Sequence, residues 1–327
     1  MSTLALPTFA DVLAARERIA RFAVVTPLLE HPALNARVKG RVLLKAENLQ
    51  RVGAFKFRGA YNAVSQIDAR AYPGGVVACS SGNHAQGVAA AATLCGMKSV
   101  IVMPADSPRL KQSRTKAFGA EVVTYDRATE DRDAIAQAIC AERKAAFVHP
   151  FDDRNVIAGQ GTAGLELMAQ ARAIGAKPDA VLVCCSGGGF AAGVALAVKD
   201  ADPACAVMTV EPAGFDDFAR SLKSGKPERN AAMAGSICDA LLSPTPGKLT
   251  FAIAQRSMAG GLVVTDDEAR AAIRFAFIEL KLVLEPGGAA ALAAVLAGKL
   301  PVEGRTTVAI LSGGNIDPDQ FAEIIRG

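Results

Sequence analysis

Lys56 is the residue of this sequence whose surroundings most favour chemistry. The segment 53–60 reads GAFKFRGA, so Phe55 and Phe57 flank the lysine. An apolar neighbourhood lowers the pKa of an amine, and a neutral amine can attack an aldehyde and later accept a proton. A single lysine is more often a solvated cation or the first residue of a helix, so other segments must support a catalytic role.

Two strand-to-helix turns offer binding sites for anions. The segment 79–89, CSSGNHAQGVA, puts serines and an asparagine before an Ala-rich helix, whose N–H groups and dipole can bind a carboxylate. The segment 184–197, CCSGGGFAAGVALA, has three consecutive glycines at the same kind of junction, where the backbone can approach a phosphate. Neither segment fits the dinucleotide fingerprint or the Walker loop. A glycine run alone is often a tight turn, but its combination with Lys56 is specific.

The elements that must position these segments alternate along the chain. Continuous apolar strands separated by helices indicate mostly parallel sheets covered on both faces, and so an α/β fold with two domains. The expected strands are 42–48, 76–80, 99–104, 121–125, 180–186, 206–212 and 307–315. The expected helices are 8–22, 58–70, 84–96, 108–119, 129–143, 155–175, 189–200, 266–282 and 287–298, with a loop at 243–250.

Composition excludes several classes of protein. The 327 residues carry a net charge of only +4 with no basic block, which argues against a nucleic-acid partner. The longest apolar stretches are too short or too interrupted to span a membrane. The seven cysteines show no framework or metal-ligand spacing, which favours reduced thiols and a cytoplasmic location.

Five motifs together resemble a known family. FKFRGA, SSGNHAQG, SGGGF, EPGGAA and LSGGN occur in this order over nearly the whole chain. The sequence is similar to the fold-type II pyridoxal-phosphate enzymes, in the branch of threonine/serine dehydratases, hydroxyaspartate dehydratases and serine racemases. The resemblance implies two open twisted, mostly parallel sheets flanked by helices, as in the tryptophan synthase β chain. It also implies a large cofactor-binding domain formed by residues 1–75 and 149–327, and a small mobile domain at 76–148.

The resemblance assigns roles to residues of the motifs. Lys56 would hold pyridoxal 5′-phosphate as a Schiff base, with Phe55 beside it. The phosphate group would bind the loop of Ser186, Gly187, Gly188 and Gly189, although the family often has glycine where Ser186 stands. Asn83 would contact the ring hydroxyl, Ser312 the pyridine nitrogen, and Glu285 would lie near the ring. The substrate carboxylate pocket would be lined by Ser80, Ser81, Asn83 and His84.

These roles imply a reaction. A hydroxyl at the ring nitrogen leaves that nitrogen neutral, so prompt loss of a β-substituent is favoured over a long-lived carbanion. We therefore expect α,β-elimination from a 3-hydroxy amino acid, with Lys56 as general base, to give a 2-oxo acid and ammonia. An amino-acid racemase is the nearest alternative, because racemases place a base at Ser81 and dehydratases also carry serine there. A non-catalytic phosphate or nucleotide binder would explain the glycines but not Lys56 or Ser312.

The segment 211–221, EPAGFDDFARS, resembles a divalent-cation site. The resemblance implies oxygen ligands from Glu211, the Phe215 carbonyl and Asp217, which suit Mg²⁺, Ca²⁺ or Mn²⁺. Taken alone, the two acids could equally be solvated residues near a helix start.

Arg132 bears on the choice of substrate. It stands where hydroxyaspartate-acting and racemase-like relatives carry an arginine that can bind a second substrate carboxylate. It could also be an ordinary surface arginine, and His149 could line the same pocket or merely end a strand. We rank the substrates as threo-3-hydroxyaspartate, then L-threonine and L-serine. Homodimers are common in such enzymes, so a homodimer is the expected assembly.

Overall fold

The chain folds around two sheets, shown by a computed structural model that describes residues 5–107, 109–126 and 128–327. The larger sheet has the strand order β1-β2-β10-β7-β8-β9 and is parallel except at the β1–β2 pair. Its strands are β1 (Leu28–Glu30), β2 (Arg41–Lys45), β7 (Ala180–Cys184), β8 (Ala206–Pro212), β9 (Gly260–Val264) and β10 (Thr306–Ile310). The two open α/β sheets confirm the predicted fold class.

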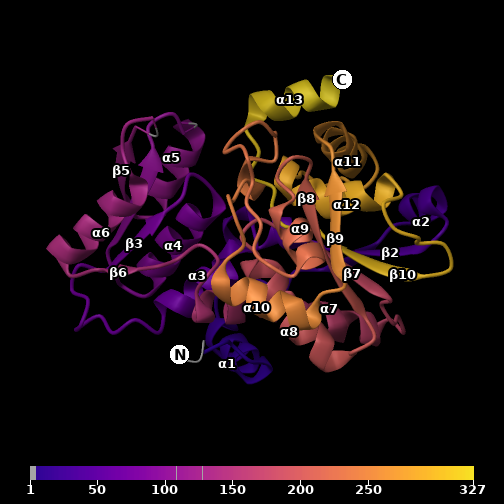
Figure 1. Cartoon of the computed structure of the whole chain (residues 1–327), viewed down its shortest axis with the longest axis horizontal. Coiled ribbons are helices and arrows are strands. Elements are labelled where there is room, and N and C mark those ends of the chain that lie inside the picture. Colours follow the sequence, from indigo (N-terminus) through magenta and orange to yellow (C-terminus); the bar gives the residue numbers. More distant parts are fainter. Residues whose placement is uncertain (1–4, 108, 127) are drawn as a thin grey trace.

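The smaller sheet is parallel throughout and has the order β5-β4-β3-β6. Its strands are β3 (Val76–Cys79), β4 (Ser99–Pro104), β5 (Glu121–Tyr125) and β6 (Ala146–Phe147). All four lie within the range 76–148 expected for a small domain, and they form a separate body at the left of Figure 1. The domain boundary and its mobility stay predictions.

Helices cover both faces of the larger sheet. Helices α7 and α8 pack on one side and α11 and α12 on the other (Figure 1). The helices of the smaller body are α4 (Asn83–Leu94), α5 (Arg109–Ala117) and α6 (Arg132–Arg143). The remaining helices are α1 (Phe9–Ile19), α2 (Pro32–Val38), α3 (Lys56–Val64), α7 (Arg154–Ala173), α8 (Gly189–Ala201), α9 (Asp217–Ser224), α10 (Lys248–Ser257), α11 (Asp266–Ile278), α12 (Pro286–Leu296) and α13 (Pro318–Arg326).

All seven expected strands and nine expected helices are present. The strands 99–104, 121–125 and 206–212 have the expected ends, and the other elements have shifted ends. The expected helix start at 108 lies outside the described residues. The sequence missed β1, β6, β9, α2, α9, α10 and α13. The prediction of a loop over 243–250 is wrong at its end, because α10 begins at Lys248. Asp152 accepts hydrogen bonds from the first N–H groups of α10, so a side chain remote in sequence caps this helix.

A buried cluster of charges supports α3, the helix that begins at Lys56. The Arg58 guanidinium, fully buried, donates to both Glu47 oxygens at 2.8 Å and to Glu166 at 2.7 and 2.8 Å. The Lys45 ammonium reaches Glu166 at 2.7 Å. Burial raises the pKa of Glu47, but the charge and hydrogen bonds of Arg58, together with Lys45 and Thr26, outweigh burial and hold that pKa below its ordinary value. The cluster therefore ties β2, α3 and α7 together by compensated charges.

Replacing Arg58 by Leu should lower the free energy of unfolding by about 3–5 kcal/mol, because Glu47 would stay fully buried without its ion-pair partner and Glu166 would keep only Lys45. Arg143→Leu is the matched control, since it removes a bidentate arginine–glutamate pair on the surface and should cost about 1 kcal/mol or less. Urea denaturation of both variants measures the difference. Equal losses would show that the cluster contributes no more than a surface pair.

Candidate active site

Lys56 starts α3 in a largely desolvated position. Its Nζ donates to the Pro150 carbonyl at 2.8 Å and lies 5.3 Å from the centroid of the Phe55 ring. Phe55 in turn stacks on Phe190 with ring centroids 3.8 Å apart. Burial lowers the pKa of Lys56 to about 8. An appreciable fraction of the amine is therefore neutral near pH 7, as nucleophilic attack requires.

The glycine loop joins β7 to α8 and has no room for side chains. A Cβ at Gly187 or Gly188 would collide with the ring of Phe151 or Phe218, and one at Gly189 would lie 2.6 Å from the Phe151 carbonyl oxygen. Gly188 also has φ +93°, which disfavours other residues. Ser186 Oγ accepts from the Ser243 N–H at 3.1 Å. The loop therefore presents bare backbone at the start of α8, as a phosphate site requires.

The second turn, residues 80–83, joins β3 to α4. Ser80 Oγ accepts from the Gly82 N–H at 3.2 Å, and Ser81 is partly exposed. Side-chain capping is absent at this described helix start, which leaves N–H groups available to a carboxylate. His84 is different, because its ring is 3% exposed and its Nε2 bonds to the Val148 carbonyl at 3.1 Å. Burial lowers the pKa of His84 to about 3, so any contribution from it would be by its backbone N–H.

Asn83 connects the two bodies through a chain of hydrogen bonds. Its Nδ2 donates to Glu285 Oε1, and its Oδ1 accepts from Asn315 Nδ2 at 2.8 Å. Asn315 Oδ1 also accepts from Arg114 at 3.0 Å. Burial raises the pKa of Glu285 to about 7, with a further contribution from Asp239. Asn83 and Glu285 thus contact each other, and their contacts with the cofactor stay predictions.

Asn315 and Arg114 were missed by the sequence analysis. Asn315 closes the LSGGN motif, so its presence beside the site could have been read from that motif. Arg114 is an exposed residue of α5, and Asn315, which it contacts, lies 201 positions further along the sequence. A contact over that separation has no local signal.

Ser312 lies just beyond β10 and is 4% exposed. Cys184, at the end of the neighbouring strand β7, has its pKa raised to about 11 by burial, and a hydrogen bond with Ser312 opposes that rise. Ser312 also accepts the Phe55 N–H at its carbonyl, 3.1 Å away. The glycine loop, Ser312 and the residue 80–83 turn all follow the carboxyl ends of parallel strands, where open α/β sheets bind ligands.

Arg132 and His149 lie at the carboxyl edge of the smaller sheet. Arg132 begins α6; its guanidinium is half exposed and pairs with Asp133 at 3.4 Å. Its carbonyl accepts from the Cys79 thiol at the end of β3, 3.4 Å away. His149 follows β6, the strand that pairs with β3.

The three residues expected to bind a cation are gathered around α9. Glu211 and Asp217 are fully buried, and Phe215 is 4% exposed. Both Glu211 oxygens accept backbone N–H groups of α9, whereas Asp217 Oδ2 is buried without a partner among the described residues. Burial and the neighbouring Asp217 raise the pKa of Glu211, and burial raises the pKa of Asp217 to about 6. Two buried carboxyls without a cation are the donor set that a divalent ion would stabilise.

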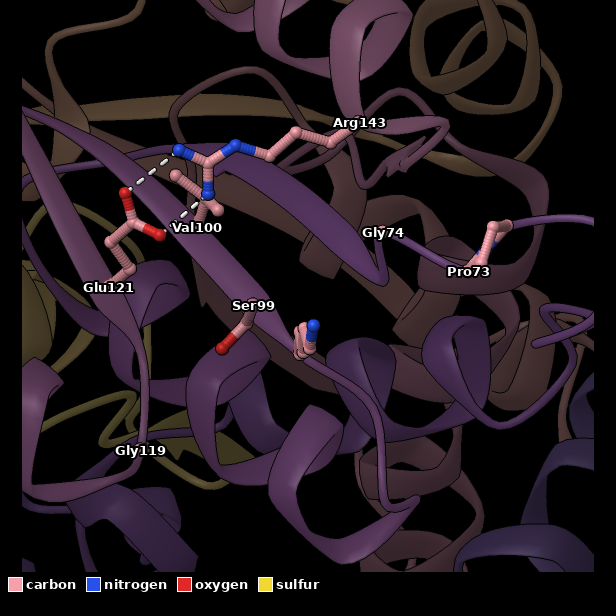
Figure 2. Close-up of a pocket in the computed structure, with 8 residues that line it drawn as sticks. Pro73, Gly74, Ser99, Val100, Gly119, Glu121 and Arg143 are labelled. Carbon is pink, nitrogen blue, oxygen red and sulfur yellow. Dashed lines mark hydrogen bonds and ion pairs between the residues drawn. The ribbon is translucent and has the colours of Figure 1, made fainter.

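Figure 2 shows a cavity of about 430 Å³ that is not part of this arrangement. It lies at the amino ends of β3 and β4, where Gly74, Ser99 and the Arg143–Glu121 pair line it. This is the edge of the smaller sheet opposite to residues 80–83. It therefore lies away from the edge that gathers the predicted site residues.

Comparison with known proteins shows the class to which this arrangement belongs. The family model for pyridoxal-phosphate dependent enzymes matches residues 19–313, and the chain belongs to this family. The chain is 39% identical over 322 residues to L-threo-3-hydroxyaspartate ammonia-lyase of Saccharomyces cerevisiae, covering 98% of this chain and 97% of the relative. It is 37% identical to serine racemase of Schizosaccharomyces pombe, covering 98% of each. The crystal structure of a threonine deaminase from T.th. superposes with a TM-score of 0.90 at 44% identity, covering 95% of this chain and 99% of the other.

The prediction of a fold-type II pyridoxal-phosphate enzyme is therefore confirmed, and the residues present fit the cofactor. The glycine loop offers backbone N–H groups with no side chain on Gly187, Gly188 or Gly189, and Lys56 is an amine of lowered pKa. When bound, pyridoxal phosphate withdraws electrons from the Cα of an attached amino acid. Which residues contact it stays a prediction.

Lys56→Ala should abolish both the absorbance of the bound cofactor near the edge of the visible range and ammonia release from 3-hydroxy amino acids. Lys98→Ala is the control, because Lys98 is an exposed lysine that lines the cavity of Figure 2. Spectra and ammonia assays of the purified proteins measure both effects. Retention of either property in Lys56→Ala would overturn the assignment of this lysine.

Proposed function

We propose that this protein is an ammonia-lyase that removes water from a small 3-hydroxy amino acid and releases a 2-oxo acid and ammonia. One observation carries the proposal. The partly neutral Lys56 occurs together with Ser312 and with two turns suited to anions, residues 80–83 and 186–189, which follow the carboxyl ends of strands. Relatives named as hydroxyaspartate ammonia-lyase and threonine deaminase support it. Small amino acids are the class of substrate.

Each part of the site has a role in this proposal. Residues 80–83 bind the substrate carboxylate through backbone N–H groups and hydroxyls. The glycine loop of residues 186–189 holds the phosphate group. The Lys56 amine accepts the Cα proton, and its lowered pKa lets it start in the neutral form. Ser312 offers a hydroxyl rather than a carboxylate to the cofactor ring, which favours prompt loss of the β-substituent.

A racemase is the second candidate, because a serine racemase is among the relatives. Racemisation needs a proton donor on the face of Cα opposite to Lys56, and the partly exposed Ser81 would supply it. Chiral chromatography of the serine that remains during a reaction separates the two functions. Accumulation of D-serine faster than ammonia would favour the racemase.

The proposed substrate preference rests on Arg132. Its guanidinium pairs only weakly with Asp133 at 3.4 Å on the surface, so a substrate carboxylate could replace that partner. A guanidinium and a carboxylate form paired, charge-assisted hydrogen bonds. We therefore place L-threo-3-hydroxyaspartate before L-threonine and L-serine.

Arg132→Ala should lower kcat/KM for L-threo-3-hydroxyaspartate by about tenfold or more and leave L-threonine nearly unaffected, because threonine has no second carboxylate. Arg143→Ala, at the opposite end of α6, is the control and should change neither substrate. Initial rates of ammonia release give the three comparisons. An equal loss on both substrates would remove the case for Arg132.

We also propose that Glu211, the Phe215 carbonyl and Asp217 bind a divalent cation such as Mg²⁺, Ca²⁺ or Mn²⁺. Support comes from two buried carboxyls and the unpartnered Asp217 Oδ2. The described residues contain no group of three or more His, Cys, Asp or Glu side chains arranged so that they could hold a metal ion by themselves. The backbone carbonyl and water would therefore complete the shell, as is usual for these ions.

The metal proposal predicts how stability depends on pH. Asp217 has a raised pKa, so between about pH 4 and 6 the folded protein holds more protons than the unfolded chain, and without metal its stability should fall as pH rises. Mg²⁺ competes with these protons, so the melting temperature gained on adding Mg²⁺ should be larger at pH 8 than at pH 5. Asp217→Asn keeps an acceptor for Asn230 and should abolish that gain while stabilising EDTA-treated protein. A melting temperature insensitive to EDTA and Mg²⁺ at both pH values would contradict the site.

Assembly and location remain proposals. Several apolar side chains on the large body are exposed, including Val25 (69%) and Ile278 (52%), and we propose that a homodimer covers some of them. The cysteines are free, which supports a reducing cytoplasm. Within the described residues, the helices are too short or too polar to cross a membrane.

A further inference from the structure

The segment 148–153 joins β6 to α7 and contacts both Lys56 and the glycine loop. The Pro150 carbonyl accepts from Lys56 Nζ at 2.8 Å, and Phe151 packs against the glycine loop. The Asp152 carboxylate caps α10, and the Asp153 carboxylate caps α7. The proposed function gives no role to the remaining polar side chain of this segment, His149.

The hydrogen bonds of His149 decide which of its ring nitrogens carries the proton. Its Nδ1 accepts the N–H of Asp152 at 2.8 Å and that of Phe151 at 3.3 Å. A nitrogen that accepts from N–H donors carries no proton itself, so the neutral ring is protonated at Nε2. Edge contacts with Phe147 and Phe151 hold the ring in place.

The burial of His149 also favours the neutral ring. Burial lowers its pKa, and the neighbouring Lys56 charge adds to that effect, while Asp152, Asp153 and Asp133 oppose it. Protonating Nδ1 would in addition break two hydrogen bonds to the backbone. The segment therefore fixes both the tautomer and the orientation of the imidazole.

This leaves the Nε2–H group as a donor. Among the described residues, the hydrogen bonds of His149 use Nδ1, and the ring is only partly buried. The Val148 N–H bonds to the Val77 carbonyl at 2.8 Å, so His149 continues β6 beside the end of β3. Arg132 lies at the same edge, through its carbonyl contact with Cys79. The charges of Lys56 and of Asp133, in the first turn of α6, both act on the His149 ring, so His149 lies near each of them.

We propose that His149 Nε2–H donates a hydrogen bond to the distal carboxylate of the substrate, so that His149 and Arg132 together select a dicarboxylic hydroxy amino acid. This inference rests on the proposed function. A neutral imidazole N–H is too weak an acid to protonate a leaving hydroxyl, so its role is recognition and not acid catalysis. A carboxylate gains more from such a donor than the methyl group of threonine, because the hydrogen bond is charge-assisted.

Two substitutions separate the two nitrogens of His149. The Asn oxygen in His149→Asn can replace Nδ1 and accept the N–H groups of Phe151 and Asp152, but the side chain is too short to replace Nε2. The Gln nitrogen in His149→Gln can replace the Nε2 donor but leaves the turn without its acceptor. We expect His149→Asn to keep the melting temperature and to lower the ratio of kcat/KM for L-threo-3-hydroxyaspartate to that for L-threonine by about tenfold or more. His149→Gln should keep most of this ratio and melt at a lower temperature.

Binding without turnover provides a second measurement. L-aspartate has the distal carboxylate and lacks the leaving hydroxyl, and L-2-aminobutyrate lacks both groups. Titrating the cofactor absorbance of the holoenzyme should show that His149→Asn weakens L-aspartate about tenfold or more and L-2-aminobutyrate little. Equal weakening of both ligands, or no change in either, would overturn the proposal. If the wild type released no ammonia from any hydroxy amino acid, the proposed function would fail. This titration would still test whether His149 binds the distal carboxylate.

The tautomer is open to direct measurement in the protein without cofactor. Nitrogen-15 NMR of labelled imidazoles should show His149 protonated at Nε2 alone from pH 8 down to pH 6, with His149→Asn identifying its signals. An Nδ1-protonated ring, or an imidazolium over this range, would refute the proposal.

Discussion

The ion cluster around Arg58 is the constraint on which the site depends. Arg58, Lys45, Glu47 and Glu166 form two positive and two negative charges in a nearly dry interior, joined by hydrogen bonds of 2.7 to 2.8 Å. Buried charges are tolerated only when each keeps its partners, so the cluster admits one arrangement of β2, α3 and α7. Because Arg58 is two residues beyond Lys56, this arrangement also fixes the start of α3 and the reactive amine.

Burial shifts the pKa of charged groups that lack an oppositely charged partner. Lys56 is hydrogen-bonded to a carbonyl rather than to a carboxylate, and burial lowers its pKa to about 8. Glu211 and Asp217 are buried beside each other, and their pKa values rise. Compensated buried charges thus support the fold, whereas uncompensated ones lie where a cofactor or cation is proposed. Perturbed groups of the second kind are typical of functional sites.

The sequence predicted those elements and site residues whose signal lies in neighbouring residues of the chain. Apolar runs between helical patterns located seven strands, and contiguous motifs located Lys56, the glycine loop and residues 80–83. Helices α9 and α10 were missed because side chains outside the helices bind their first N–H groups. These are Glu211, seven residues before Phe218, and Asp152, 96 residues before Lys248. Strand β6 has only two residues, too few for a periodic pattern. The links from Asn83 to Glu285 and Asn315 depend on how the two bodies meet, which no local pattern encodes.

The segment 148–153 explains why so many features of the site occur together. Its Pro150 carbonyl fixes the Lys56 amine, and Phe151 occupies the volume that side chains on the glycine loop would need. Asp152 caps α10, which packs against α8 behind that loop. A shift of this segment would therefore move the amine and the phosphate cradle together. This segment also follows β6, the last strand of the smaller sheet along the chain, so it is one of the connections between the two bodies, and His149 lies in it.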